Sequence, residues 1–111
     1  MQMLDFNAIQ QPTWPIKMKD GTVVNLSVPS VDMIEKLLAM APELEEIASK
    51  KDGRSIRAAY DLIAQIMSYN DDGYTFTAEE LRDKYRMTLL DMFKFVAGYM
   101  EFAKEIQDAK N

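Results

Sequence analysis

The side chains that could do chemistry in this 111-residue chain are carboxylates, amines and phenols, because the sequence contains neither histidine nor cysteine. That composition removes the commonest general base, the commonest zinc ligand and every thiolate nucleophile. The remaining carboxylates that could do acid–base work fall where helices are expected to start, so the helix dipole and solubility explain them; they are Glu43, Glu45, Glu46, Glu79 and Glu80. We therefore expect no catalytic residue and predict that the protein is not an enzyme.

Patterns that bind phosphate or metal are also missing or incomplete. The glycines stand singly, at positions 21, 53, 73 and 98, so the chain has neither a glycine-rich phosphate loop nor a nucleophile elbow. The segment 68–79 is only faintly similar to a calcium loop, because Ser68 stands where the first Asp belongs and Thr75 replaces an apolar residue. We expect no metal and no cofactor.

The last part of the chain, in contrast, has a pattern that suits binding. At helical spacing its apolar residues form two stripes, the first comprising Leu89, Met92, Phe93, Val96, Met100 and Ala103. The second is rich in aromatic residues and comprises Phe95, Tyr99, Phe102 and Ile106. A helix docked on one side of a small core needs only one stripe. Either a hairpin covers the second stripe or it binds a partner or a second copy, and we take its four residues as the candidate partner-binding site.

The hairpin in question is predicted near the N-terminus, where two runs of alternating apolar residues flank Asp20-Gly21. A two-residue loop would put the apolar faces of the strands out of phase. A three-residue loop with Gly21 in the left-handed conformation puts every large side chain on one face; it pairs Met18 with Thr22, Ile16 with Val24, and Trp14 with Leu26. This loop predicts that Gly21→Ala is destabilising and that Lys19→Ala is near neutral.

Helices are predicted after the hairpin. Ser30 can cap a first helix, whose apolar positions are Val31, Ile34, Leu37, Leu38 and Ala41. Pro42 should stop or kink it, and a short helix should then run from Pro42 to about Lys51 and end at Asp52-Gly53. A further helix from about Ser55 to Tyr69 has one apolar stripe, formed by Ile56, Ala59, Tyr60, Ile63, Ile66 and Met67.

Two capping patterns follow the break at 70–73. Thr77 and Glu80 form a capping box, with Phe76 and Leu81 as its hydrophobic staple, so a helix is predicted to start at Ala78. The segment 88–91 has the form of a second cap, which predicts a break near Met87 before the long last helix. The fold class is therefore α+β: one domain over residues 1–111, with a lead-in and β-hairpin in 1–30 and four to five helices in 31–111.

Composition limits the classes of partner. Hydrophobic residues make up 48% and charged residues 28% of the chain, which is typical of a globular domain. The net charge of -5 disfavours a surface for duplex DNA. Neither a membrane span nor a signal peptide is recognisable, so we expect an intracellular, cytoplasmic protein.

The N-terminal part of the chain has a pattern that consists of Phe6, then Trp14-x-Ile16-x-Met18-x-Asp20-Gly21-x-Val23-x-Asn25-Leu26-x-Val28-Pro29-Ser30, leading into a helix over 31–40. This pattern resembles that of the tail assembly chaperones of long-tailed phages and prophages of Gram-positive bacteria. The resemblance covers residues 5–40 best, and the other helices are similar only in size, acidity and helical content. It implies a non-enzymatic protein of the bacterial host cytoplasm that binds the apolar tape-measure protein, keeps it soluble and helps to recruit tail-tube subunits. The family is often made in short and frameshift-extended forms, of which this chain would be the short one.

Two alternatives from other classes stay open. A small DNA-binding regulator would use 78–85 and 89–99 as a helix-turn-helix, with phosphate contacts from Arg82, Lys84, Arg86 and Lys94. A self-associating helical domain would have no client at all. The acidic balance argues against the first, and a monomeric elution profile would exclude the second.

Overall fold

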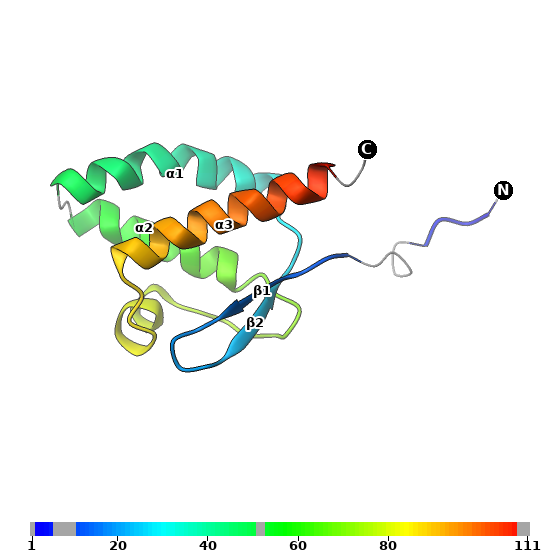
Figure 1. The fold of residues 1–111 in the computed structure, drawn as a ribbon, viewed down its shortest axis with the longest axis horizontal. Coiled ribbons are helices and arrows are strands. Elements are labelled where there is room, and N and C mark those ends of the chain that lie inside the picture. The colour runs from blue at the N-terminus through cyan, green and yellow to red at the C-terminus, as the bar shows by residue number, and fades with distance from the viewer. Residues whose placement is uncertain (1, 6–10, 51–52, 109–111) are drawn as a thin grey trace.

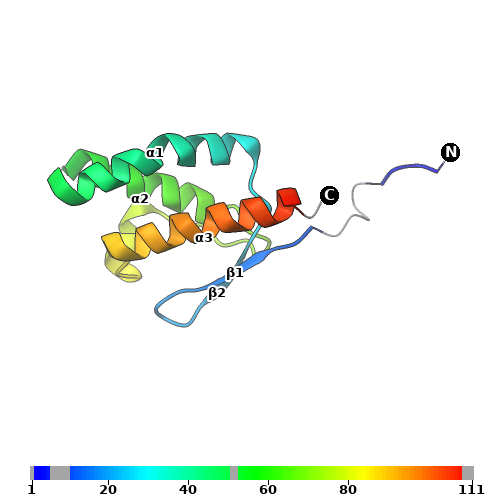
Figure 2. The same cartoon turned by 45° about the horizontal axis from the view of Figure 1, so that its top comes forward.

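The computed structural model describes residues 2–5, 11–50 and 53–108, and the side chains within these ranges except those of 43–50 and 53–55. In chain order its elements are strands β1 (Trp14–Lys17) and β2 (Val23–Leu26), helices α1 (Val31–Lys50) and α2 (Gly53–Met67), the π-helical turn η2 (Glu80–Lys84), and helix α3 (Leu89–Asp108). Helix α3 lies between the α1–α2 pair and the hairpin (Figures 1 and 2). The predicted α+β class is confirmed.

The hairpin has the predicted register. Trp14 pairs with Leu26 and Ile16 with Val24. The loop closes where the N–H of Met18 donates to the carbonyl of Thr22 at 2.8 Å, and Gly21 has a φ of 95°. All the large side chains of one face thus point at the helices. Phe6, the first residue of the N-terminal pattern, lies outside the described residues.

The outer edge of β2 is closed by the turn that follows α2. Asn70 makes an antiparallel bridge with Leu26, and its side chain holds the turn through bonds with the backbone of Met67, Asp72 and Tyr74. Further bonds join the two segments: Ser27 N–H to Tyr69 O at 3.1 Å, Asp71 N–H to Asn25 O at 3.0 Å, and Asn25 N–H to Asp72 Oδ2 at 2.7 Å. Asp71 and Asp72, two acidic residues of the faint calcium pattern, therefore hold a strand edge. Among the described residues, no three His, Cys, Asp or Glu side chains gather where they could hold a metal ion.

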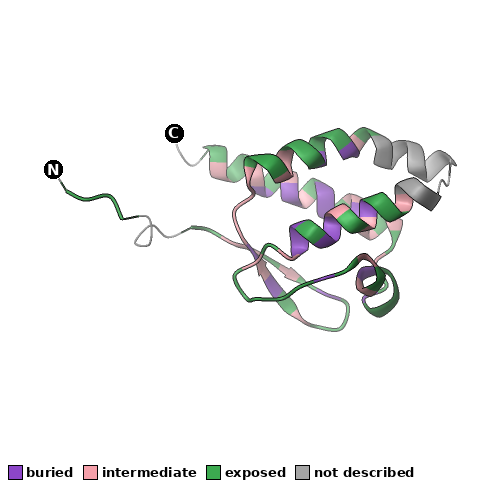
Figure 3. Ribbon diagram, turned by 180° about the vertical axis from the view of Figure 1, so that it is seen from behind, coloured by how far each residue is buried: buried purple, intermediate pink, exposed green. Residues whose placement is uncertain are grey.

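The core lies where the three helices and the hairpin meet (Figure 3). Its most deeply buried members come from every layer, and are Val24, Leu26, Leu37, Ile63, Ile66, Met67, Leu81, Met92 and Tyr99. The predicted stripe of α2 faces this core: four of its six residues are buried, and Ile56 and Tyr60 pack against them. The helix itself runs two residues earlier than predicted at each end.

Helix α1 differs from the prediction in two ways. It passes through Pro42 without ending, so the separate helix from Pro42 to about Lys51 does not form, and Gly53 begins α2 instead of ending a helix. Pro42 is exposed, so water can bond the carbonyl of Leu38 that the missing N–H leaves free. The described α1 side chains that reach the core are those of Leu37 and Met40, whereas Val31 and Leu38 of the predicted stripe are exposed. The side chains of Glu43, Glu45 and Glu46, and residues 51–52, lie outside what the structure describes.

Both predicted caps are present. The N–H of Glu80 donates to Oγ1 of Thr77 at 3.2 Å, and the staple residues Phe76 and Leu81 are buried. The segment is helical for a single turn, continues as η2, and ends before Met87, as predicted. Helix α3 then starts at the second cap, which Thr88 and Asp91 form.

Candidate partner-binding site beside strand β1

Three of the four residues predicted to bind a partner complete the core instead. Phe95, Tyr99 and Phe102 are 7%, 1% and 6% exposed, and the ring of Trp14 lies 5.5 to 6.3 Å from theirs, centroid to centroid. Ile106 is half-buried and packs against the same cluster. The prediction that these residues form an open surface is corrected here: the apolar face of the hairpin needs a cover, and the aromatic stripe of α3 supplies it.

Gly98 makes this packing possible. A Cβ atom at this position would lie 2.6 Å from Cζ2 and 2.7 Å from Cη2 of Trp14. The indole stacks on Phe95 at an interplanar angle of 27°, so it cannot withdraw without losing that contact. A glycine in the middle of α3 therefore sets how closely β1 approaches the helix.

A cavity of about 270 Å³ opens between β1, the chain around Met87 and the start of α3. Its apolar walls come from four parts of the chain and consist of Trp14, Ile16, Met18, Met67, Tyr85, Met87 and Phe95. Three of these are methionines, whose flexible side chains adapt to apolar groups of different shape. No residue of β2 lines the cavity, so it opens along the outer edge of β1.

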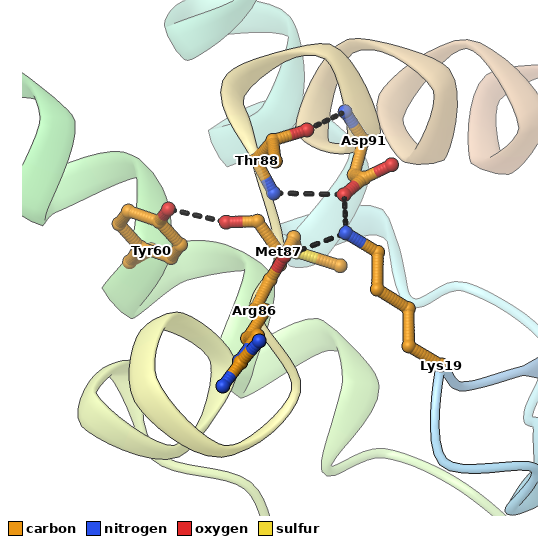
Figure 4. Close-up of polar contacts among 6 residues, drawn as sticks. All are labelled: Lys19, Tyr60, Arg86, Met87, Thr88 and Asp91. Atoms are coloured by element: carbon orange, nitrogen blue, oxygen red, sulfur yellow. Dashed lines mark hydrogen bonds and ion pairs between the residues drawn. The ribbon is translucent and has the colours of Figure 1, made fainter.

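The same cavity is bordered by three lysines and one aspartate: Lys17, Lys19, Lys94 and Asp91. Lys19 is already bonded, because its Nζ lies 2.6 Å from Oδ2 of Asp91 and donates to the carbonyl of Arg86 at 2.6 Å (Figure 4). Lys17 and Lys94 make no side-chain hydrogen bond or ion pair with any residue that the structure describes. A locally positive rim thus surrounds an apolar cavity on a chain whose net charge is -5.

Asp91 joins the hairpin tip to the start of α3. Its carboxylate accepts the N–H of Thr88 at 2.8 Å, and its own N–H donates to Oγ1 of Thr88 at 3.2 Å, which completes the predicted cap. The Lys19 ammonium, with the N–H of Thr88, lowers the pKa of Asp91 to about 2. The sequence identified the cap, but the cation that joins it comes from the other end of the chain.

The wall around Met87 is positioned by an unusual backbone. Arg86 has a φ of 52°, a left-handed conformation that is uncommon outside glycine, and the N–H of Met87 reaches back to the carbonyl of Leu81 at 2.8 Å. This turn directs the carbonyl of Arg86 at Lys19 and that of Met87 at the hydroxyl of Tyr60 (Figure 4). Burial raises the pKa of Tyr60, so the phenol stays a donor.

Sequence reasoning missed this cavity. Phe95 alone of the four predicted residues lines it, and Lys94 was considered only as a phosphate contact. The one local signal was the position of Lys17 and Lys19 in and beside β1, next to alternating apolar residues. Their neighbours on α3 are more than seventy residues away in the sequence, and no periodicity reports such a juxtaposition.

The helix-turn-helix alternative loses its first helix, because 78–85 forms only a turn of α-helix followed by the five-residue η2. One of its proposed phosphate contacts is also engaged, since the guanidinium of Arg82 donates to the carboxylate of Asp83 at 2.9 Å. No protein-family model, curated protein or solved structure matches the chain. Within the described residues, no helix is long and apolar enough to cross a bilayer.

Proposed function

We propose that this chain is a tail assembly chaperone of a long-tailed phage or prophage, which binds the tape-measure protein in the bacterial cytoplasm and assists assembly of the tail tube without catalysing a reaction. The resemblance of residues 5–40 suggests the family. The observation that carries the proposal is the methionine-lined cavity beside β1, because it offers an apolar client a preformed contact on a folded domain.

Two further properties support this role. Several large apolar side chains are exposed on the body of the domain, among them Val31 (73%), Leu90 (62%) and Leu38 (54%). Exposed apolar groups of this kind suit repeated, weak contacts with a long apolar client. The net charge of -5 keeps a complex of this kind in solution through mutual repulsion.

Co-expression tests the proposal. The chain is produced together with the very long tape-measure protein that the proposal predicts a neighbouring gene to encode, and the soluble fraction of that protein is measured with and without the chain. We expect the long protein to be soluble, and to co-purify, only when the chain is present. Equal solubility in both cases, with no co-purification, overturns the proposal.

A pair of methionine variants locates the contact. Met87→Gln places a polar group in the wall of the cavity, whereas Met100→Gln makes the same change at a half-buried position of α3 outside it. We expect the first variant to lower recovery of the long protein and the second to preserve it. Melting curves of both variants show whether any loss reflects unfolding.

The regulator alternative has its own measurement. A protein that neutralises several phosphates binds duplex DNA with an affinity that falls steeply as salt rises. We expect no such binding from this acidic chain. Submicromolar affinity at physiological salt, weakening as salt is added, would favour the regulator over the chaperone.

A further inference from the structure

We propose that the cavity beside β1 takes one apolar side chain of an amphipathic helix, and that acidic residues flanking that side chain contact Lys17 and Lys94. This deepens the proposed function, on which it rests for the identity of the client, by naming the chemistry of the segment that is bound. Three features of the molecule support this inference: the size of the cavity, the charge of its rim and the hydrogen-bonding groups of the strand edge beside it.

Size limits the occupant first. The cavity measures about 270 Å³, below the range of roughly 300–1,000 Å³ that is usual for sites of drug-sized ligands. Its lining is apolar except at the rim, and the described residues that line it offer no side-chain carboxylate, amide or hydroxyl group other than those of Asp91 and Tyr85 to orient a cofactor. An apolar side chain presented by a larger partner fits this arrangement better than a free small molecule.

Charge sets what must flank that side chain. Asp91 neutralises Lys19, which is also bonded to the carbonyl of Arg86, so Lys19 has little left to offer a partner. Lys17 and Lys94 stand on β1 and α3 at the border of the cavity, with no side-chain partner among the described residues. Two unpaired cations on a chain of net charge -5 select a segment that is acidic next to its apolar anchor.

The strand edge decides between a helix and a strand as the bound segment. Trp14 and Ile16 form the hydrogen-bonded pairs with β2, so the backbone groups of Pro15 and Lys17 point toward the open edge. Pro15 has no N–H, which leaves Lys17 as the one donor that β1 offers along this edge. An added strand would be poorly bonded, whereas a helix needs no backbone donors from the site.

The experiment uses the intact chain and synthetic helical peptides as probes. The first peptide has one Phe flanked by Glu residues one turn before and after it; the second has Lys in place of Glu, and the third has Ala in place of Phe. Trp14 is the chain's single tryptophan and lines the cavity, so its fluorescence reports binding. We expect the Glu peptide to bind, and the Lys and Ala peptides to bind at least about tenfold more weakly.

Charge reversal supplies the matched variants. Lys17→Glu with Lys94→Glu should weaken binding of the Glu peptide at least about tenfold and strengthen binding of the Lys peptide. Lys36→Glu with Lys104→Glu changes the net charge equally on exposed positions away from the cavity, and should leave both affinities within about twofold. Circular dichroism confirms that both double variants are folded.

Several results would overturn the inference: equal affinity for the Glu and Lys peptides, equal losses in the two double variants, or no change at Trp14. A fourth is a Trp14 signal that depends on protein concentration without peptide and disappears when residues 1–11 are deleted. That result would show that the cavity is filled by the N-terminal residues of a second copy, among which Met3 and Leu4 are exposed. A soluble long protein with no peptide binding would overturn this inference alone, whereas peptide binding without an effect on the long protein would overturn the proposed function.

Discussion

The two edges of the hairpin differ in what covers them. Along β2, the turn that follows α2 bonds the outward backbone groups, so that edge belongs to the fold. Along β1, a proline removes one donor, Lys17 has no side-chain partner within the described part of the chain, and an apolar cavity opens toward α3. The same small sheet therefore has one edge that stabilises the domain and one edge that remains available for a partner.

This difference follows from where each strand lies. Strand β2 passes the end of α2, where the carboxylate of Asp72 accepts the N–H of Asn25 and that of Asp71 accepts the hydroxyl of Ser27. The side chain of Asn70 holds the turn itself in place. Strand β1 passes over α3, where Trp14 meets Gly98 and the rings of Phe95 and Tyr99. These residues offer ring contacts rather than hydrogen bonds. An edge without hydrogen-bonding neighbours can pair with a foreign strand unless a proline or a charge prevents it. Strand β1 has both, so its edge stays unpaired and leaves the cavity beside it accessible to a partner.

The largest expected effect comes from separating β1 from α3. Gly98→Ala should destabilise the domain by about 1–3 kcal/mol in urea unfolding, because its methyl group enters the space of the Trp14 ring. In a Trp14→Leu background the same change should be neutral or stabilising, since alanine favours a helix over glycine by about 0.5–1 kcal/mol. An equal loss in both backgrounds would show that the ring does not set the distance between β1 and α3.

The closed edge should break when Asn70 is truncated. Asn70→Ala removes two donated and two accepted hydrogen bonds, and we expect a loss of about 1–3 kcal/mol in the free energy of unfolding. Asp71→Ala removes only the bond to the hydroxyl of Ser27 and serves as the milder control. Peptide binding at the open edge should not change in either variant; a loss there would show that the edges are coupled.

The loop that joins β1 and β2 should have the next largest effect on stability. Gly21→Ala should cost about 1 kcal/mol, and the cause is backbone strain, because no atom beyond the two adjacent residues lies within 4 Å of the added methyl group. Gly21→Asn should cost less, since asparagine tolerates the left-handed conformation better. Equal stability of all three proteins would contradict the three-residue loop.

The smallest effect concerns the ion pair between Lys19 and Asp91, a contact that the prediction of a near-neutral Lys19→Ala did not include. Both side chains are partly exposed, 52% and 33%, so solvent screening limits the pair to about 1 kcal/mol or less. The pKa of Asp91 is lowered in the folded state to about 2, so the stabilisation is present above the ordinary value of 3.8 and is lost as pH falls toward 2.

Urea unfolding of the wild type and Lys19→Met measures this dependence. The wild type should be the more stable protein at pH 6, and the difference should shrink between pH 4 and about 2. Added salt should reduce it at pH 6 as well. A difference that stays constant with pH would indicate that Lys19 acts through its bond to the carbonyl of Arg86 alone.

Local features of this chain could be predicted from the sequence because short-range rules determine them. The hairpin register follows from side-chain alternation and the conformation that Gly21 allows, and both caps follow from the spacing of Thr and Glu or Asp. The stripe of α2 follows from helical periodicity. The effect of Pro42 was misjudged because a proline's position relative to solvent decides whether a long helix ends there, and that position is tertiary information.

Tertiary structure alone decided what the apolar stripes and lysines do. The sequence determined that α3 has a second stripe, but whether Phe95, Tyr99 and Phe102 face a partner or the hairpin depends on Trp14 lying over Gly98. Likewise, Lys17 and Lys94 border one cavity only because β1 packs beside the start of α3. Periodicity specifies which residues share a face of one element, whereas the pairing of faces between distant elements is settled by packing of the whole chain.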